Sequence, residues 1–200
     1  MKKFIYLISP NKIYKSFYKD LDQAFSTKKV KYFQIRFKKK DKKSIIKIAK
    51  NVKSIALRHK VKLIINDSVT ITKIVKADGC HIGQSDGNIL KARKELKNKI
   101  LGSTCHNSRM LINKAIKNNV DYIALGSFYK SKLKPRAIKA DLKNLIWARK
   151  ITKKPIIAIG GINHKNYKKL IKSGANYIAL SSFIWNNKKL KPWSAIKKFN

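Results

Sequence analysis

The chain has 200 residues, of which 44% are hydrophobic; this suffices for one domain with a substantial core and excludes a disordered basic tail. Its 49 Lys and Arg residues against 9 Asp and Glu give a formal net charge of +40. The lysines are spread through every segment without a basic arm or stripe, so we expect no specific nucleic-acid partner. Such a field instead favours anionic small molecules as substrates.

Cysteine content and hydropathy predict the cellular compartment of the protein. Two cysteines, Cys80 and Cys105, form no disulfide framework and indicate a reducing cytoplasm. The apolar run at residues 4–8 ends at Ser9-Pro10, so it is too short for a signal peptide. Since no segment approaches the ~20 apolar residues of a membrane helix, we expect a cytoplasmic protein without a membrane span.

Short strand-like runs alternate with amphipathic segments along the chain. Eight such units predict parallel strands joined by helices and closed into a barrel. The rival is an open doubly wound sheet, which usually has a Gly-rich turn after its first strand, where this chain has Ser9-Pro10-Asn11. The predicted fold is therefore α/β, a single-domain (β/α)8 TIM barrel over residues 1–200. We expect strands at 4–9, 32–37, 62–66, 79–83, 100–104, 122–126, 156–160 and 177–181, and helices near 14–26, 42–59, 68–76, 88–97, 107–119, 140–152, 164–173 and 193–199.

The second predicted strand carries a polar stripe. Gln34, Arg36 and Lys38 follow at i, i+2 and i+4, so the period of a strand places them on one face. Polar groups facing a barrel lumen are costly unless they bind something, and an Arg with a Lys suits a pyrophosphate. The alternative is a solvated lysine run at residues 38–40 in a lysine-rich protein.

Acidic residues follow the third and fourth predicted strands. Asn66-Asp67 and Asp86 are candidate Mg²⁺ ligands, because Mg²⁺ is typically held by one or two carboxylates together with substrate phosphates. The alternative is that Asp67 and Asp86 cap the helices that follow them.

The loops after the last three strands are candidate anion sites. In barrels a phosphate commonly binds between the loops after strands seven and eight, where this chain has Gly160-Gly161 and Ser181-Ser182. A tight turn is the bland alternative for the glycines. The loop at residues 126–136 is long and basic, and we interpret it either as a mobile anion clamp or as a solvated loop.

Cys80-His81 and Cys105-His106 do not predict zinc. Neighbouring residues on a strand face opposite ways, and the spacing of metal ligands is absent. Either histidine can still line the site, and His81 shares a face with Gly79 and Gly83.

Taken together, the motifs in residues 4–185 resemble the thiamine-phosphate synthase family, and the first strand and residues 105–109 look like its alphaproteobacterial members. Any one motif is weak, but their joint order and strand placement are specific. They are Gln34-Ile35-Arg36-Phe37-Lys38, Ile65-Asn66-Asp67, the run from Asp78 to Asp86, Leu101-Gly102-Ser103-Thr104-Cys105-His106, Tyr122-Ile123-Ala124-Leu125-Gly126, Ala158-Ile159-Gly160-Gly161-Ile162 and Ala179-Leu180-Ser181-Ser182.

The resemblance implies a Mg²⁺-dependent transferase that joins hydroxymethylpyrimidine pyrophosphate to hydroxyethylthiazole phosphate, giving thiamine phosphate and pyrophosphate. It implies a dissociative route, in which pyrophosphate leaves before the thiazole nitrogen attacks. It also implies these roles: Asp67 and Asp86 hold Mg²⁺; Gln34, Arg36, Lys38, Asn66 and Lys134 engage the pyrophosphate or the pyrimidine; His81 lies near the pyrimidine; Thr104 stands where the family has a serine; and Gly161, Ser181, Ser182 and Ser131 serve phosphate binding.

One motif departs from the family pattern. After strand six the family usually shows Pro-Thr-x-Thr-Lys, whereas this chain has Lys130-Ser131-Lys132-Leu133-Lys134. Leu133 removes a hydroxyl donor, at a cost of roughly 1–3 kcal/mol in phosphate binding. Two alternatives stay open: a thiazole tautomerase of the same fold, which as a rule lacks the paired acids, and a non-catalytic basic protein that binds nucleic acid.

Overall fold

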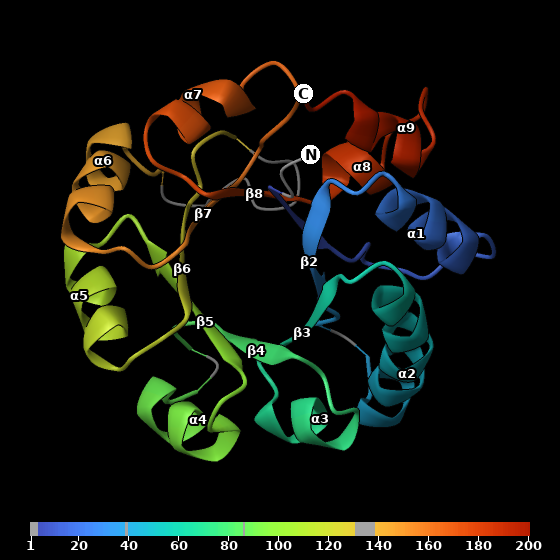
Figure 1. The fold of residues 1–200 in the computed structure, drawn as a ribbon, viewed down its shortest axis with the longest axis horizontal. Helices are drawn as coiled ribbons and strands as arrows, with labels where there is room; N and C mark the ends of the chain where they lie inside the picture. Colours follow the sequence, from blue (N-terminus) through green and yellow to red (C-terminus); the bar gives the residue numbers. More distant parts are fainter. Residues whose placement is uncertain (1–3, 39, 86, 131–138) are drawn as a thin grey trace.

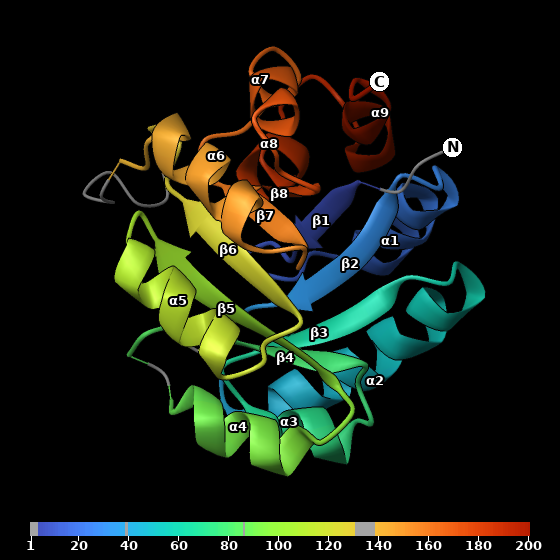
Figure 2. The same ribbon diagram turned by 60° about the vertical axis from the view of Figure 1, so that its left-hand side comes forward.

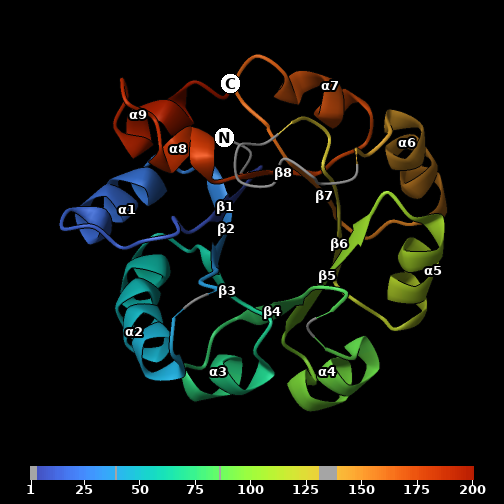
Figure 3. The same ribbon diagram turned by 180° about the vertical axis from the view of Figure 1, so that it is seen from behind.

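The computed structural model describes residues 4–38, 40–85, 87–130 and 139–200. Eight parallel strands follow one another around a closed barrel in chain order, and β1 pairs with both β2 and β8 to complete it. Figure 1 shows the ring of strands surrounded by helices, and Figure 3 shows the same ring from behind. The predicted (β/α)8 barrel is confirmed.

The strands and helices alternate with one addition at the end. The strands are β1 Ile5–Ile8, β2 Val30–Ile35, β3 Lys62–Asn66, β4 Gly79–Ile82, β5 Ile100–His106, β6 Tyr122–Gly126, β7 Ile156–Ile159 and β8 Tyr177–Leu180. The helices are α1 Phe17–Ser26, α2 Lys42–Arg58, α3 Val69–Ile74, α4 Ile89–Leu96, α5 Arg109–Lys117, α6 Leu142–Ile151, α7 Tyr167–Lys172, α8 Ser182–Trp185 and α9 Pro192–Lys197.

The helices coat the outside of the barrel because each has one apolar face (Figure 2). In α2 the buried positions are Ala49, Val52, Ile55 and Ala56, at helical spacing. The helix begins at Asp41, whose carboxylate accepts a hydrogen bond from the Ser44 amide at 2.8 Å. Side chains such as these form the larger core, between the sheet and the helices.

A second core fills the lumen, and its lower part is aromatic. Tyr6, Tyr32, Tyr122 and Tyr177, here called the tyrosine layer, pack with ring centroids 5.2–5.9 Å apart for the contacting pairs. Aliphatic side chains such as Ile64 and Ile157 belong to the same cluster and fill the remaining space. The barrel is therefore a packed core below its upper rim rather than a pore, as is usual for this fold.

Polar side chains at the lower end of the barrel cap the starts of alternate strands. Asp78, Asp121 and Asn176 each lie just before an even-numbered strand. Their side-chain oxygens accept hydrogen bonds from amides at the starts of the preceding strands, from Leu63 at 2.9 Å, Leu101 at 2.7 Å and Ile156 at 2.9 Å. Two of the few acids in the chain are therefore used for the architecture.

One predicted strand needs correction, and one observed helix was not predicted. β2 begins at Val30 and ends at Ile35, so the predicted strand at 32–37 is shifted by two residues, because Ile5 in β1 pairs with Val30. The short helix α8 was not expected; together with α9 it fills the space between α7 and α1 (Figures 1 and 3). Four residues are too few to show a helical period in the sequence.

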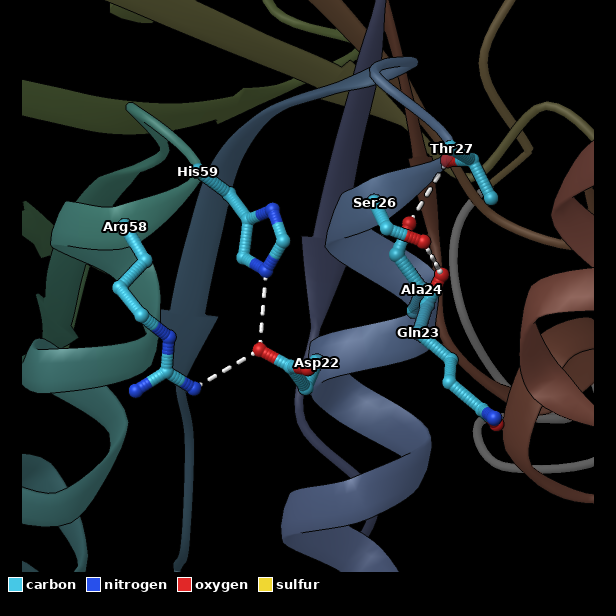
Figure 4. A network of polar contacts seen from close by, with 7 residues as sticks. All are labelled: Asp22, Gln23, Ala24, Ser26, Thr27, Arg58 and His59. Carbon is cyan, nitrogen blue, oxygen red and sulfur yellow. Dashed lines mark hydrogen bonds and ion pairs between the residues drawn. The ribbon is translucent and has the colours of Figure 1, made fainter.

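Surface pairs connect neighbouring helices. Asp22 on α1 accepts from Arg58 at the end of α2 at 2.8 Å and lies 2.9 Å from Nε2 of His59 (Figure 4). Both hydrogen bonds lower the pKa of the Asp22 carboxyl, and the one with Arg58 has the larger effect. In the part of the chain that the structure describes, no helix is long and apolar enough to cross a membrane.

Candidate active site

The polar residues predicted from strands two and three meet at the C-terminal ends of those strands. Gln34 points into the lumen and is 3% exposed, and its side-chain nitrogen donates to Asn66 Oδ1 at 3.0 Å. The amide nitrogen of Asn66 in turn donates to Asp67 Oδ2. The three side chains thus form one chain of hydrogen bonds that runs from β2 to the end of β3.

Asp67 is held in a strained backbone conformation at the end of β3. Its φ is 60°, a left-handed value that non-glycine residues rarely adopt. Its amide donates to the His81 carbonyl at 2.8 Å, and its Oδ1 accepts from the Gly83 amide at 3.2 Å. The carboxylate is therefore oriented from both β3 and β4.

Neither predicted helix cap is made by an acid. Ser68, not Asp67, is the N-cap of α3, with its hydroxyl accepting from Ile71 at 3.1 Å. Asn88 caps α4 by accepting from Lys91 at 3.1 Å. The capping interpretation is wrong for Asp67, and Asp86 lies outside the described residues.

The site residues fit a divalent cation as far as the structure describes them. Asp67 could supply a hard carboxylate ligand, and the half-buried Asn66 could supply an amide oxygen beside it. The described residues contain no group of three or more His, Cys, Asp or Glu side chains that would hold a metal alone. A site with one or two carboxylates is typical of Mg²⁺ that is shared with substrate phosphates.

His81 lies in the lumen between two hydroxyl groups. Its Nδ1 is 3.0 Å from the Tyr122 hydroxyl and its Nε2 is 2.8 Å from Thr104 Oγ1. Burial, and secondarily the charge of Arg36, lowers the pKa of His81 to about 4, so the ring is neutral at neutral pH. Cys80, its neighbour, is buried in the outer core, as the strand alternation predicts.

Arg36 and Lys38 both lie beyond β2. Because the strand ends at Ile35, the period-two argument reaches Gln34 but not Lys38, which is exposed. Arg36 is half-buried, and its charge acts on His81 from above the lumen. The ion pairs of the described residues involve Asp22, Asp78, Glu95 and Asp121, none of which pairs with Arg36.

Ser9 is a site residue that the sequence reasoning missed. It is 2% exposed, and its Oγ accepts from the Arg36 amide at 3.0 Å, which fixes the backbone from which Arg36 projects. Its carbonyl accepts from the Ser181 hydroxyl at 3.3 Å. The available signal was a serine just past the end of the first strand.

The two glycines after β7 pack tightly against the loop after β6. Gly160 and Gly161 have φ values of 104° and 61°. A Cβ at Gly161 would lie 2.4 Å from the Lys130 carbonyl oxygen, and one at Gly160 would lie 2.0 Å from Ser127 Oγ. The tight turn by itself therefore accounts for both glycines, and a phosphate role for Gly161 stays a prediction.

Ser181 and Ser182 mark the junction of β8 and α8. Ser182 is the first residue of the helix and Ser181 its N-cap, and both are half-buried. The first amides of any helix have no acceptor within the helix, which suits an anion. Ser131 and Lys134, together with the Leu133 substitution, lie outside the described residues.

The arrangement supplies hydrogen-bond donors, cations and one oriented carboxylate at the open end of a barrel, but the described part shows no activated nucleophile. Burial raises the pKa of both Cys80 and Cys105 to about 12, so neither thiol ionises at neutral pH. Such a site is built for stabilising charge rather than for covalent or acid–base catalysis.

Similarity to known proteins agrees with this chemistry. A family model described as thiamine monophosphate synthase matches residues 5–184. The chain is 52% identical over 198 residues to the thiamine-phosphate synthase of Pelagibacter ubique, an alphaproteobacterium, covering 98% of this chain and 96% of the relative. It is 36% identical over 187 residues to that of Erythrobacter litoralis, covering 91% and 88%.

A solved structure shares the fold. The thiamine phosphate pyrophosphorylase from Pyrococcus furiosus aligns with a TM-score of 0.86 and 24% identity, covering 98% of this chain and 94% of that one. The family model covers nearly the whole barrel, and each of the two relatives matches this chain over most of its own length. The chain therefore belongs to the thiamine monophosphate synthase family.

Proposed function

We propose that this protein couples hydroxymethylpyrimidine pyrophosphate with hydroxyethylthiazole phosphate to give thiamine phosphate and pyrophosphate. The observation that carries the proposal is family membership over residues 5–184 combined with one polar constellation at the barrel rim. The enzyme is a transferase, and both substrates carry phosphate groups, which suits a chain of net charge +40.

The proposed route is dissociative. The bond between the pyrimidine methylene carbon and the pyrophosphate oxygen breaks with its electron pair on the oxygen, which leaves a methylene cation. The thiazole nitrogen then donates its lone pair to that carbon, and pyrophosphate is released. No proton has to move in the step that makes the bond, so stabilisation of the leaving charge is the main demand on the protein.

Several residues are suited to stabilising the charge on the leaving pyrophosphate. Arg36 is half-buried at the end of β2, and a guanidinium offers a planar fork for phosphate oxygens. We assign it, with Lys38 and Lys134, to the pyrophosphate, and Gln34, Asn66 and His81 to the pyrimidine. Thr104, whose Oγ1 lies 2.8 Å from Nε2 of His81, is assigned as a catalytic hydroxyl group.

The metal and the second phosphate complete the proposed site. Asp67, with Asp86, would hold Mg²⁺, which when bound neutralises part of the charge on the leaving pyrophosphate. Gly161, Ser181 and Ser182 are assigned to the thiazole phosphate, with Ser131 from the preceding loop. The half-buried helix start at Ser182 and the nearby glycine turn support this placement.

We further propose one domain over residues 1–200, a cytoplasmic location and no specific nucleic-acid or membrane partner. In support, the elements from β1 to α9 belong to one barrel, and α9 packs against α1. Both cysteines are free and buried, as in a reducing compartment.

The test is a reaction of the purified protein with both substrates and Mg²⁺, followed by mass detection of thiamine phosphate. We expect product that disappears with chelator and is restored by Mg²⁺. Absence of product from a folded sample would contradict the proposed acceptor, and the Lys130–Lys134 segment would be the first place to look for an altered one.

Two substitutions at one position separate the roles of Asp67. Asp67→Asn keeps an acceptor for the Gly83 amide but loses the charge, whereas Asp67→Ala loses both. We expect each to lower kcat/KM by at least about 100-fold, because the lost carboxylate would no longer hold the Mg²⁺ that stabilises the charge developing on the leaving pyrophosphate. Asp22→Asn on α1 is the control and should keep its activity. An active Asp67→Asn variant would show that the carboxylate only orients the loop.

A further inference from the structure

A line of hydrogen bonds connects the tyrosine layer to the open end of the barrel. The Tyr6 and Tyr122 hydroxyls are 2.8 Å apart, Tyr122 OH is 3.0 Å from His81 Nδ1, and His81 Nε2 is 2.8 Å from Thr104 Oγ1. Tyr6 and Tyr122 are 3% and 1% exposed. Four side chains from four strands are thus joined end to end, and the last two, His81 and Thr104, belong to the proposed site.

The local structure is arranged to let Tyr122 reach His81. Gly102 on β5 pairs with His81 on β4 and with Tyr122 on β6, so it lies between them. A Cβ at Gly102 would fall 1.9 Å from the Tyr122 ring, so any side chain there would displace the ring. The Tyr122 and His81 rings stack at an interplanar angle of 14°.

The direction of the hydrogen bonds follows from counting protons. A neutral histidine has one N–H, so the line has two possible directions. If Thr104 donates to Nε2, then Nδ1–H donates to Tyr122, Tyr122 donates to Tyr6, and the Tyr6 hydrogen needs a further acceptor. Among the described residues, Tyr122 is the only hydrogen-bond partner of the Tyr6 hydroxyl. A buried hydroxyl without an acceptor is costly, which disfavours this direction.

In the opposite direction the hydrogens of Tyr6, Tyr122 and His81 all have an acceptor. Tyr6 donates to Tyr122, Tyr122 donates to Nδ1, and Nε2–H donates to Thr104 Oγ1. The Thr104 hydroxyl then accepts the hydrogen bond from His81 Nε2–H, so its own hydrogen is directed away from His81. This is the state in which Thr104 donates to an anionic oxygen in the site.

We propose that Tyr122 is a positioning residue that, with Tyr6 behind it, holds His81 in the Nε2–H tautomer and thereby makes Thr104 a hydrogen-bond donor to the substrate. The tautomer depends only on the fold. The consequence for Thr104 rests on the proposed function, with the departing pyrophosphate as the acceptor class.

The tautomer is tested first, on the unsubstituted protein. Nitrogen NMR of the ¹⁵N-histidine-labelled chain at pH 7 reports which ring nitrogen carries the proton, and His81→Gln identifies the His81 signals. A proton on Nε2 supports the proposal, and a proton on Nδ1 overturns it. Because this measurement needs no turnover, it stands even if the proposed reaction is wrong.

A double-mutant cycle tests the consequence. Tyr122→Phe keeps the ring and removes the hydroxyl, and we expect kcat to fall about tenfold with little change in KM. If Tyr122 acts through Thr104, the same substitution has no further effect in a Thr104→Val background. Equal losses of kcat in both backgrounds would show a merely structural role and overturn the proposal.

Tyr32→Phe is the matched control. Tyr32 belongs to the same layer, 5.9 Å from Tyr122 between ring centroids, but its ring contacts are with other tyrosines and not with His81. Its substitution should leave kcat unchanged. A loss equal to that of Tyr122→Phe would mean that any lesion in the tyrosine layer has this effect, which also contradicts the proposal.

Discussion

His81 shows how much the environment of one side chain changes its chemistry. In the sequence it is one of four histidines and lies next to a cysteine, a pair whose spacing does not predict a metal site. In the barrel it lies against Tyr122 and Thr104, and burial holds its pKa near 4. A neutral ring with both nitrogens hydrogen-bonded is a donor and acceptor in fixed directions, not a titrating group at neutral pH.

This burial predicts a pH dependence of stability. The unfolded histidine binds a proton below about pH 6.5, while the folded one does so only below about pH 4. Between these values the unfolded state binds more protons, so the contribution to stability is present above pH 6.5 and is lost as pH falls toward 4. We expect a loss of about 2 kcal/mol between pH 7 and pH 5 from this group.

Urea unfolding at the two pH values measures the effect. The unsubstituted protein should lose more of its free energy of unfolding between pH 7 and pH 5 than a His81→Asn variant does. The same loss in both proteins would mean that His81 does not carry the shift.

At the scale of elements, the two ends of the strands have separate tasks. The C-terminal ends carry Gln34, Asn66 and Thr104, and the N-terminal ends carry the side chains that cap strand amides. This division is general for barrels, because loops at the C-terminal face form the sites. Acids such as Asp78 and Asp121 therefore serve stability rather than chemistry.

Asp121→Ala tests this division. It removes the acceptor of the Leu101 amide and the partner of Arg93, so we expect a loss of about 1–2 kcal/mol in the free energy of unfolding, with kcat/KM unchanged. Asp121→Asn keeps an oxygen for the amide and should recover most of the loss. Asp22→Ala, an exposed pair, should cost less than about 1 kcal/mol. A large drop in kcat from Asp121→Ala would contradict the separation.

The whole molecule is dominated by positive charge on the helical coat. Exposed lysines occur on α2, α4, α5, α6 and α7, which belong to the helical coat outside the barrel. Charge of one sign repels itself and destabilises the compact state, although it also attracts anionic substrates. Salt screens both effects over a Debye length of about 8 Å at physiological ionic strength.

Neutralising part of this coat should raise stability without affecting catalysis. In a variant with six exposed lysines changed to Gln, we expect a higher melting temperature at low salt and kcat/KM within about twofold at physiological salt. A large loss of kcat/KM at physiological salt would show that the coat has a catalytic purpose. The six are Lys47, Lys50, Lys94, Lys117, Lys150 and Lys168.

The alternation of apolar runs and amphipathic segments determined the barrel, since periodicity and order are local properties that survive in a single sequence. It also indicated Gln34, Asn66 and Asp67 as rim residues, because strand ends can be read from the chain. The sequence did not determine the shifted bounds of β2, because pairing with β1 sets them.

Only the tertiary structure decided which residues of different strands contact one another. Ser9 with Arg36, Gly102 with the Tyr122 ring, and Tyr122 with His81 are contacts between residues at least 20 positions apart in sequence. Such contacts depend on barrel closure and on strand register, which place side chains from separate strands at one height. A pattern within a single strand carries no record of that height, so the chain alone predicted the rim but not the line of hydrogen bonds beneath it.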